Sequence, residues 1–227
     1  MRLPREQILK ELGIAPVWRL KEQPETSAGG VPAGSGADRR SQIMRMDWPE
    51  LKEAVRTCTA CDLYKTRTQG VIGVGDEKAE WLIIGEAPGA DEDVRGEPFV
   101  GQAGKLLDAM LAAIGLKRGE NVYIANVLKS RPPGNRNPAP EEVAACMPYL
   151  ERQIQLIQPK IILALGRFAV QSLLNTEEAI GRLRGRVHQY HGVPFIVTYH
   201  PAYLLRNLPD KEKAWEDLCL ARVTMKK

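Results

Sequence analysis

The hydrophobic residues of this chain gather in four short continuous runs. These runs are WLIIG (81–85), NVYIANVL (121–128), KIILALG (160–166) and PFIVTYH (194–200). Segments with a helical period lie between or after them, at 102–114, 140–157, 167–174 and 210–225. Continuous apolar strands that alternate with helices predict a mainly parallel sheet with both faces covered. We therefore predict an α/β fold, a three-layer αβα sandwich around a central, mainly parallel four-stranded sheet.

The pattern is different in the first part of the chain. Residues 4–13 fit a short amphipathic helix, with Ile8, Leu9 and Leu12 on one stripe. From Glu22 onward the sequence is rich in Gly, Pro, Ser and Ala, which is typical of a flexible linker. We predict an N-terminal segment at 1–21, a linker at 22–45 and one catalytic domain at 46–227. The sequence does not identify a partner for residues 1–20.

Composition limits the location and the partners of the protein. A chain of 227 residues with 44% hydrophobic residues can bury one sizeable core. Its apolar runs are too short to span a bilayer, and the charged start, MRLPREQILKELGI, has no apolar leader. We expect a cytoplasmic protein without a membrane partner. The net charge of +4 is compatible with a polyanionic partner but does not require one.

Two of the four cysteines, Cys58 and Cys61, are two residues apart in the sequence CTAC. In a reducing compartment such a pair indicates metal binding or redox chemistry rather than a structural disulfide. A thioredoxin-like redox pair would begin a helix directly after a strand, whereas CTAC follows the helical stretch WPELKEAVRT (48–57). The residues by themselves leave zinc and iron–sulfur chemistry open.

The ends of the predicted strands carry the residues best suited to chemistry. In open α/β sheets, ligands bind beyond the carboxyl ends of the strands. GEAPGADED (85–93) and Phe99 follow the first strand, Asn126 lies near the end of the second, and His200 ends the fourth. A phosphate-loop lysine motif and a dinucleotide fingerprint are both missing from the sequence, which counts against nucleotide-driven and hydride-transfer chemistry. A pocket of Asn, His, Phe and carboxylate side chains is expected at this edge.

Four motifs in order, GEAPGADED, GEPFVGQAGKLLD, ANVLKSRPPGNRNP and HPAYLL, resemble those of the family 4 (iron–sulfur) uracil-DNA glycosylases. The resemblance runs from about Leu51 to Arg222. It implies an enzyme of the uracil-DNA glycosylase superfamily that hydrolyses the N-glycosidic bond of uracil in single- or double-stranded DNA. The product is an abasic site, which initiates base excision repair, and a monomer is expected. The alternative is a DNA-binding member of the superfamily that recognises uracil or deaminated bases with weak or no turnover.

The resemblance assigns the base contacts to residues with suitable chemistry. Gly85 and Phe99 are both assigned to the base-binding site, and Phe99 is expected to stack on a base flipped out of the helix. Asn126 is expected to accept a hydrogen bond from uracil N3–H and to donate one to O4. His200 is expected to donate to O2, where negative charge accumulates as the glycosidic bond breaks.

The resemblance is less direct about the attacking water and the DNA contacts. Family 1 enzymes have an Asp where this chain has Ala87, so Glu86, or alternatively Glu92, is expected to position the water. Asp91 and Asp93 are interpreted as part of a solvated loop. The space left by the flipped base is assigned to Leu204, Leu205 and Arg206. The DNA phosphates are assigned to Lys129, Arg131 and Arg136.

The family binds a 4Fe-4S cluster through four cysteines, and this chain departs from that pattern at one position. Cys58, Cys61 and Cys146 match three ligands, but Ser130 stands where the fourth cysteine is expected. A serine hydroxyl is a harder and poorer ligand for iron–sulfur clusters than a thiolate. Three outcomes remain open: Ser130 ligates the cluster, another ligand or a three-iron cluster replaces the usual arrangement, or the cluster is absent. A zinc site on the three cysteines is a further possibility, and Cys219 is interpreted as a buried helix residue.

Overall fold

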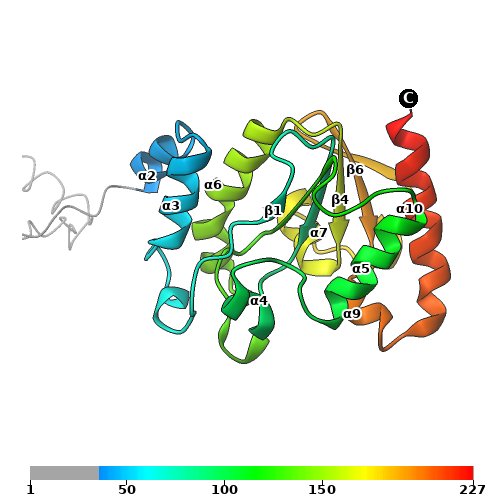
Figure 1. The fold of residues 1–227 in the computed structure, drawn as a ribbon, viewed down its shortest axis with the longest axis horizontal. Helices are drawn as coiled ribbons and strands as arrows, with labels where there is room; N and C mark the ends of the chain where they lie inside the picture. The colour runs from blue at the N-terminus through cyan, green and yellow to red at the C-terminus, as the bar shows by residue number, and fades with distance from the viewer. Residues whose placement is uncertain (1–35, 227) are drawn as a thin grey trace, which may run out of the picture. The chain divides into compact units, whose positions relative to one another are not determined.

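The computed structural model describes residues 36–226, so the helix predicted at 4–13 and most of the predicted linker lie outside the described residues. The described residues form an α/β unit around a six-stranded sheet with the order β1-β3-β2-β4-β6-β5 (Figure 1). The strands are β1 (Val74–Gly75), β2 (Trp81–Gly85), β3 (Val122–Asn126), β4 (Ile161–Leu165), β5 (Val187–Tyr190) and β6 (Val193–Thr198). Strands β3, β2, β4 and β6 run parallel, and β1 and β5 are antiparallel at the two edges.

The α/β class and the four parallel strands are confirmed, but the prediction of a four-stranded sheet is wrong. The two additional strands lack the signal of a continuous apolar run. Strand β1 has only two residues, and β5 alternates between more and less exposed side chains. Edge strands face solvent on part of their surface, so a search for fully buried strands misses them.

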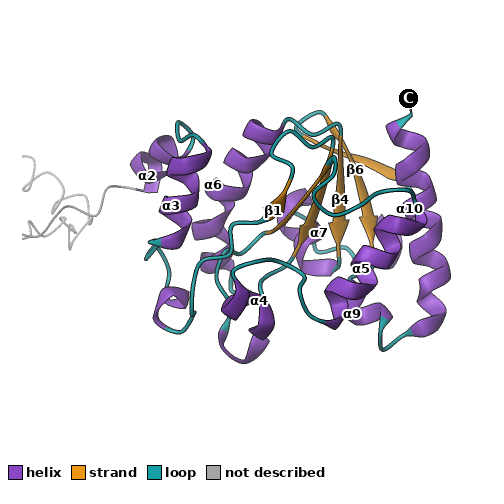
Figure 2. Cartoon of the chain, viewed as in Figure 1, coloured by secondary structure: helices purple, strands orange, loops and turns teal. Residues whose placement is uncertain are grey.

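Helices cover both faces of the sheet (Figure 2). The α-helices are α2 (Gly36–Ile43), α3 (Trp48–Arg56), α4 (Ala90–Arg95), α5 (Gln102–Ala113), α6 (Pro140–Ile157), α7 (Arg167–Leu174), α8 (Ile180–Leu183), α9 (Pro201–Leu204) and α10 (Lys211–Met225). Short 3₁₀ turns are η1 (Asp62–Lys65), η2 (Pro133–Asn135) and η3 (Leu208–Asp210). No helix within residues 36–226 is both long and apolar enough to cross a bilayer.

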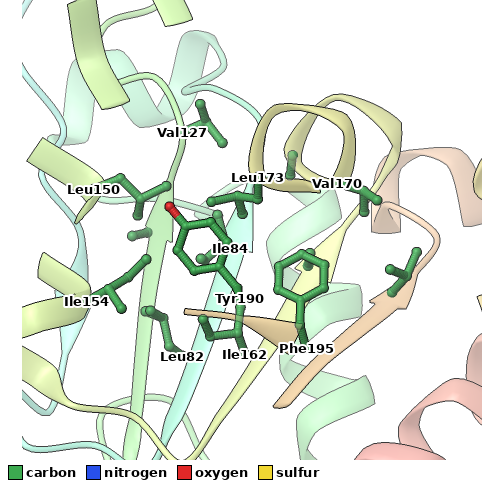
Figure 3. Packing of buried hydrophobic residues seen from close by; sticks show 14 of the residues in the cluster. Leu82, Ile84, Val127, Leu150, Ile154, Ile162, Val170, Leu173, Tyr190 and Phe195 are labelled. Carbon is green, nitrogen blue, oxygen red and sulfur yellow. The ribbon is translucent and has the colours of Figure 1, made fainter. Parts of the chain in front are cut away.

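The hydrophobic core lies in two layers, one on each face of the sheet. Successive side chains of a strand point to opposite faces. Leu82 and Ile84 of β2 accordingly pack with residues of α6 and α7, as Figure 3 shows. Trp81 and Ile83 pack with residues of α5 and α10 on the other face. Because both faces of β2, β3 and β4 are buried, their sequences read as continuous apolar runs.

Helix α2 occupies the last part of the segment predicted as a linker, so a linker that extends to residue 45 is not what the structure contains. Ile43, 2% exposed, packs with Leu51, Val55 and Tyr149. Arg152 on α6 also donates to the main-chain oxygen of Met46 at 2.6 Å. Ile43 is the buried apolar side chain that anchors α2. The surrounding small and polar residues give no hydrophobic pattern from which this helix could be predicted.

Replacing Ile43 with Ala should lower the free energy of unfolding by about 2–3 kcal/mol, since the change deletes buried methyl groups and leaves a cavity. Equilibrium urea denaturation measures this difference. Val94→Ala is the matched control, because Val94 is 68% exposed and should change stability by less than about 0.5 kcal/mol. Equal effects of the two substitutions would show that α2 is not packed onto the domain.

Candidate active site

A cavity of about 850 Å³ opens where the parallel strands end. Its lining includes a residue at or just after the end of each parallel strand: Glu86 after β2, Asn126 on β3, Gly166 after β4 and His200 after β6. Phe99, from the loop between α4 and α5, completes this group. The structure thus brings together the predicted residues Glu86, Phe99, Asn126 and His200. The parallel topology explains the convergence, because all four strands end at the same edge of the sheet.

Asn126 presents a buried hydrogen-bond acceptor to this cavity. Its side chain is 2% exposed, and its Oδ1 has no hydrogen-bond partner among the described residues. Gly85 pairs with Asn126 in the register of β2 and β3, and a Cβ at position 85 would lie 2.4 Å from this Oδ1. A buried unpaired acceptor costs about 1–3 kcal/mol. The site therefore offers a place for a ligand that donates a hydrogen bond.

Phe99 is held at the cavity wall by its backbone rather than by a regular element. Its φ of 56° is in the left-handed region, which is unfavourable for an aromatic residue. The Arg118 guanidinium donates to the main-chain oxygens of Pro98 and Phe99 at 2.9 and 2.8 Å. A Cβ at Gly104 would lie 1.8 Å from the Phe99 oxygen, so only glycine allows α5 to pack this closely. These contacts stabilise the strained loop.

His200 is oriented by the helix that it caps. Its Nδ1 accepts a hydrogen bond from the main-chain N–H of Ala202 at 3.1 Å, at the start of α9. Burial, together with the positive charge of Arg206, lowers the pKa of His200 to about 4. The ring is therefore neutral at pH 7. Because Nδ1 is an acceptor, the single ring proton is on Nε2. The ring centroid lies 5.4 Å from that of Phe99.

Glu86 is a half-buried carboxyl group that lines the cavity. Burial raises the pKa of Glu86 to about 7, and the positive charge of Arg167 partly opposes this rise. A carboxyl group with such a pKa is partly ionised near neutral pH, which suits a general base. Perturbed carboxyl groups in clefts are typical of functional sites.

Two of the three acidic residues that follow Glu86 in this motif, Glu92 and Asp93, have structural contacts. Glu92 Oε1 accepts hydrogen bonds from the main-chain N–H groups of Val100 and Gly101, and Oε2 accepts one from Gly89. Glu92 thus connects the two loops that border the cavity. The interpretation of Asp93 as solvated is wrong, because it is 2% exposed and accepts a hydrogen bond from the main-chain N–H of Thr68.

The residues predicted to contact DNA differ in their exposure. Leu204 is 1% exposed and packs in the core, so it is not available as a wedge, whereas Leu205 is 42% exposed. Arg206 is exposed and lines the cavity. Lys129 is 1% exposed, and its predicted phosphate contact is therefore wrong.

The two predicted arginines remain at the surface region of the loop after β3. Arg136 is exposed and pairs with Glu142, with a hydrogen bond of 3.0 Å from Nη1 to Oε2. Arg131 is partly exposed and donates to Asn135 Oδ1 at 2.8 Å. Arg136 is thus already paired with Glu142 on α6, and Arg131 with Asn135 in η2. A phosphate contact would require each arginine to exchange or share its hydrogen bond.

Cys61 and Cys146 are neighbours at a small apolar cluster that also contains Leu63 and Leu128. A hydrogen bond between the two thiols lowers the pKa of Cys61 to about 6 and raises that of Cys146. The main-chain N–H of Lys129 donates to the Cys146 sulfur at 3.5 Å. These two cysteines, distant in sequence, therefore form one thiol site.

Ser130 and Cys58 are connected to this region through Arg67. One guanidinium nitrogen of Arg67 donates to Ser130 Oγ at 2.6 Å, and another donates to the Cys58 main-chain oxygen at 3.0 Å. Within residues 36–226, no three His, Cys, Asp or Glu side chains form a preassembled metal-binding group. Cys219 is on α10, which covers the opposite face of the sheet from α6 and Cys146.

Arg118, Gly104 and Arg167 contribute to the site but are not among the residues predicted from the sequence. Gly104 carries a signal that could have been used, because a single glycine inside a helical pattern often marks a close approach of backbone. Arg118 gives no such signal, since it lies 19 residues from Phe99 in a polar turn. Arg167 lines the cavity at the start of α7, and its effect on Glu86 depends on tertiary structure alone.

Comparisons with known proteins identify the family of the chain. The model of the uracil DNA glycosylase superfamily matches residues 72–219. The chain is 52% identical over 164 residues to a type-4 uracil-DNA glycosylase of Archaeoglobus fulgidus, covering 69% of this chain and 82% of that protein. It is 42% identical over 192 residues to the Thermotoga maritima type-4 enzyme, with coverages of 83% and 97%. A type-5 uracil-DNA glycosylase of Thermus thermophilus is 36% identical over 118 residues, with coverages of 46% and 53%. The chain therefore belongs to the type-4 uracil-DNA glycosylases of the uracil-DNA glycosylase superfamily.

Proposed function

We propose that this protein removes uracil from DNA by hydrolysing its N-glycosidic bond, which leaves an abasic site. The observation that supports this proposal most directly is the buried, unpaired Oδ1 of Asn126 in a cavity that also contains Phe99 and His200. A base must leave the helical stack to reach such a cavity, because its Watson–Crick edge is otherwise paired. Single- and double-stranded DNA containing uracil are both expected substrates.

Base selection follows from the hydrogen-bonding groups of Asn126. Its Oδ1 accepts the proton of uracil N3, and its Nδ2 donates to uracil O4. Cytosine has an acceptor at N3 and a donor at N4, so both contacts would oppose like groups. Sites that hydrogen-bond a buried ligand discriminate steeply, because the wrong ligand leaves these groups unpaired. Phe99 contributes a stacking face that any pyrimidine can use.

His200 stabilises the departing base. As the bond between C1′ and N1 breaks, its electron pair moves onto uracil, and O2 carries part of the charge. The Nε2–H of a neutral His200 donates to O2, and Ala202 already holds the ring from the other side. Such a donor needs no reorganisation during the reaction, which is the basis of electrostatic stabilisation in active sites.

Glu86 serves the attacking water. Its ionised carboxylate accepts a proton as the water oxygen bonds to C1′, so the sugar gains a hydroxyl group and uracil leaves as an anion. Glu92 is less suited to this role, because its two oxygens already accept three main-chain hydrogen bonds. We assign the space left by the flipped base to Leu205 and Arg206, a role that their exposure after α9 supports.

The cysteine site has a donor set that suits the iron–sulfur cluster of the family, with one substitution. We assign Cys58, Cys61 and Cys146 as thiolate ligands and Ser130 as the weaker fourth position. The Arg67 contacts to Ser130 and to the main chain of Cys58 bring the fourth position and the CTAC loop to one place. A bound cluster would connect the CTAC loop, the loop after β3 and α6, and so stabilise loops beside the DNA-binding edge.

Asn126→Ala should lower the single-turnover rate of uracil release by about 10- to 100-fold, since it removes the recognition contacts while leaving the cavity open. Release is measured as alkali-labile sites on a labelled oligonucleotide with one uracil. Asn121→Gly is the matched control, because Asn121 precedes the same strand at its other end and has a φ of 57° that glycine accepts. DNA binding by the unsubstituted protein without base release would instead support the non-catalytic alternative.

The rate of uracil release should rise with pH up to about 7 and then level off. Burial raises the Glu86 pKa to about 7, and the ionised form is the active one, so protonation below this pH removes activity. His200, with a pKa of about 4, stays neutral throughout and adds no second step between pH 5 and 9. Glu86→Gln should lower the plateau and abolish the pH dependence. A flat profile for the unsubstituted enzyme would contradict the role of Glu86.

Ser130→Cys should increase the iron and sulfide retained after purification, because it restores a fourth thiolate. Visible absorbance and chemical iron and sulfide analysis of anaerobically purified protein measure this change. Cys61→Ala should abolish the signal, and Cys219→Ser, on the opposite face of the sheet, should leave it unchanged. No iron in either the unsubstituted protein or Ser130→Cys would contradict the ligand assignment.

A further inference from the structure

Lys129 is a buried lysine that the mechanism above does not use. It is 1% exposed and lies three residues after Asn126. Its Nζ donates to the main-chain oxygen of Asn126 at 2.6 Å and to Gln153 Oε1 at 2.6 Å. Burial of an amino group is unfavourable unless hydrogen bonds satisfy it. Burial accordingly lowers the pKa of Lys129 to about 7.

The hydrogen bond from Lys129 Nζ to the Asn126 main-chain oxygen lies at the carboxyl end of β3. The main-chain N–H groups of Val127 and Leu128 donate to the oxygens of Gly85 and Glu86, so the chain after Asn126 stays attached to β2. The main-chain oxygen of Asn126 instead accepts the hydrogen bond from Lys129 Nζ. Three hydrogen bonds thereby fix the two peptide groups that follow Asn126, the residue whose side chain enters the cavity. The direction of that side chain depends on this backbone.

Gln153 gives Lys129 a rigid support. It lies on α6, is fully buried, and its Nε2 donates to the Ile72 main-chain oxygen at 2.8 Å and to the Tyr123 hydroxyl at 3.3 Å. The contact from Lys129 to Gln153 therefore connects the end of β3 with α6 and with the loop before β1. Movement of Lys129 would require several buried hydrogen bonds to break together.

The main chain of Lys129 belongs to the cysteine site. Its N–H donates to the Cys146 sulfur at 3.5 Å, and its oxygen accepts from the N–H of Val71 at 2.8 Å. The next residue is Ser130, which Arg67 contacts. One residue thus contacts the cysteine site through its backbone and the base-recognition residue through its side chain.

We propose that Lys129 is a positioning residue for base recognition, whose side chain clamps the main chain of Asn126 and so aims its amide at the flipped base. The proposal rests on the proposed role of Asn126. It replaces the phosphate contact predicted for Lys129, which its burial rules out. It also provides a physical route by which the state of the cysteine site influences uracil recognition.

A double-mutant cycle tests this proposal. Single-turnover uracil release is measured for Lys129→Met, Asn126→Ala and the double variant, with melting temperatures recorded on the same preparations. Lys129→Met should lower the rate by about 10- to 100-fold, because a small misplacement of a contact group has such an effect. The same substitution in the Asn126→Ala background should cause no further loss, since the amide that Lys129 positions is already absent.

Tyr123→Phe is the matched control. It removes the hydroxyl that contacts Gln153 but leaves both hydrogen bonds of Lys129 in place. It should lower the melting temperature while the rate of uracil release stays close to that of the unsubstituted enzyme. A purely structural role of the buried network would instead make rate and melting temperature fall together in both variants.

Two results would overturn the proposal: an unchanged rate for Lys129→Met, or a loss of the same size in the presence and absence of the Asn126 amide. If Asn126→Ala alone leaves the rate unchanged, the proposed role of Asn126 fails instead, so the two failures are distinguishable. Lys129→Gln, which keeps a neutral donor at this position, replaces Lys129→Met in the same cycle if the latter is insoluble, and its results are read in the same way.

Discussion

The absence of a side chain at Gly85 is the constraint on which the candidate site depends. Strands β2 and β3 end side by side, and Gly85 pairs with Asn126 across them. A Cβ at position 85 would lie 2.4 Å from Asn126 Oδ1 and 2.5 Å from the Phe99 ring. Any other residue would displace both of these cavity-lining groups. The parallel sheet brings these strand ends together. The absence of a Cβ at Gly85 leaves space for the side chains of Asn126 and Phe99.

Burial gives the polar groups at this edge their unusual properties. Desolvation raises the pKa of Glu86 to about 7 and lowers that of His200 to about 4. One environment therefore favours a partly protonated acid and a neutral imidazole, because charge is disfavoured in both cases. The same desolvation makes the unpaired Oδ1 of Asn126 costly without a ligand. A ligand that donates a hydrogen bond to this oxygen would remove that cost.

The cysteine site is separate in sequence from the base cavity but close to it in structure. Ala87 lines the cavity and also packs with Cys61 and Cys146. Lys129 and Ser130 occupy the same loop, one beneath Asn126 and the other in contact with Arg67. Ser130, which stands where a cysteine is expected, therefore directly follows the residue whose side chain donates to the Asn126 main-chain oxygen. The loop after β3 is connected to the cavity by the buried hydrogen bond from Lys129 Nζ to the Asn126 main-chain oxygen.

The sequence by itself determined the four parallel strands, the helices between them and the convergence of Asn126, His200 and the GEAPGADED motif at one edge. These features follow from local periodicity and from the rule that parallel strands end together. Only the tertiary structure decided that α2 and the edge strands β1 and β5 exist, since one anchor residue or a half-exposed strand leaves little pattern. Tertiary structure also decided that Lys129 and Leu204 are buried while Leu205 is exposed. Side chains adjacent in sequence differ in this way because burial depends on contacts between residues far apart along the chain.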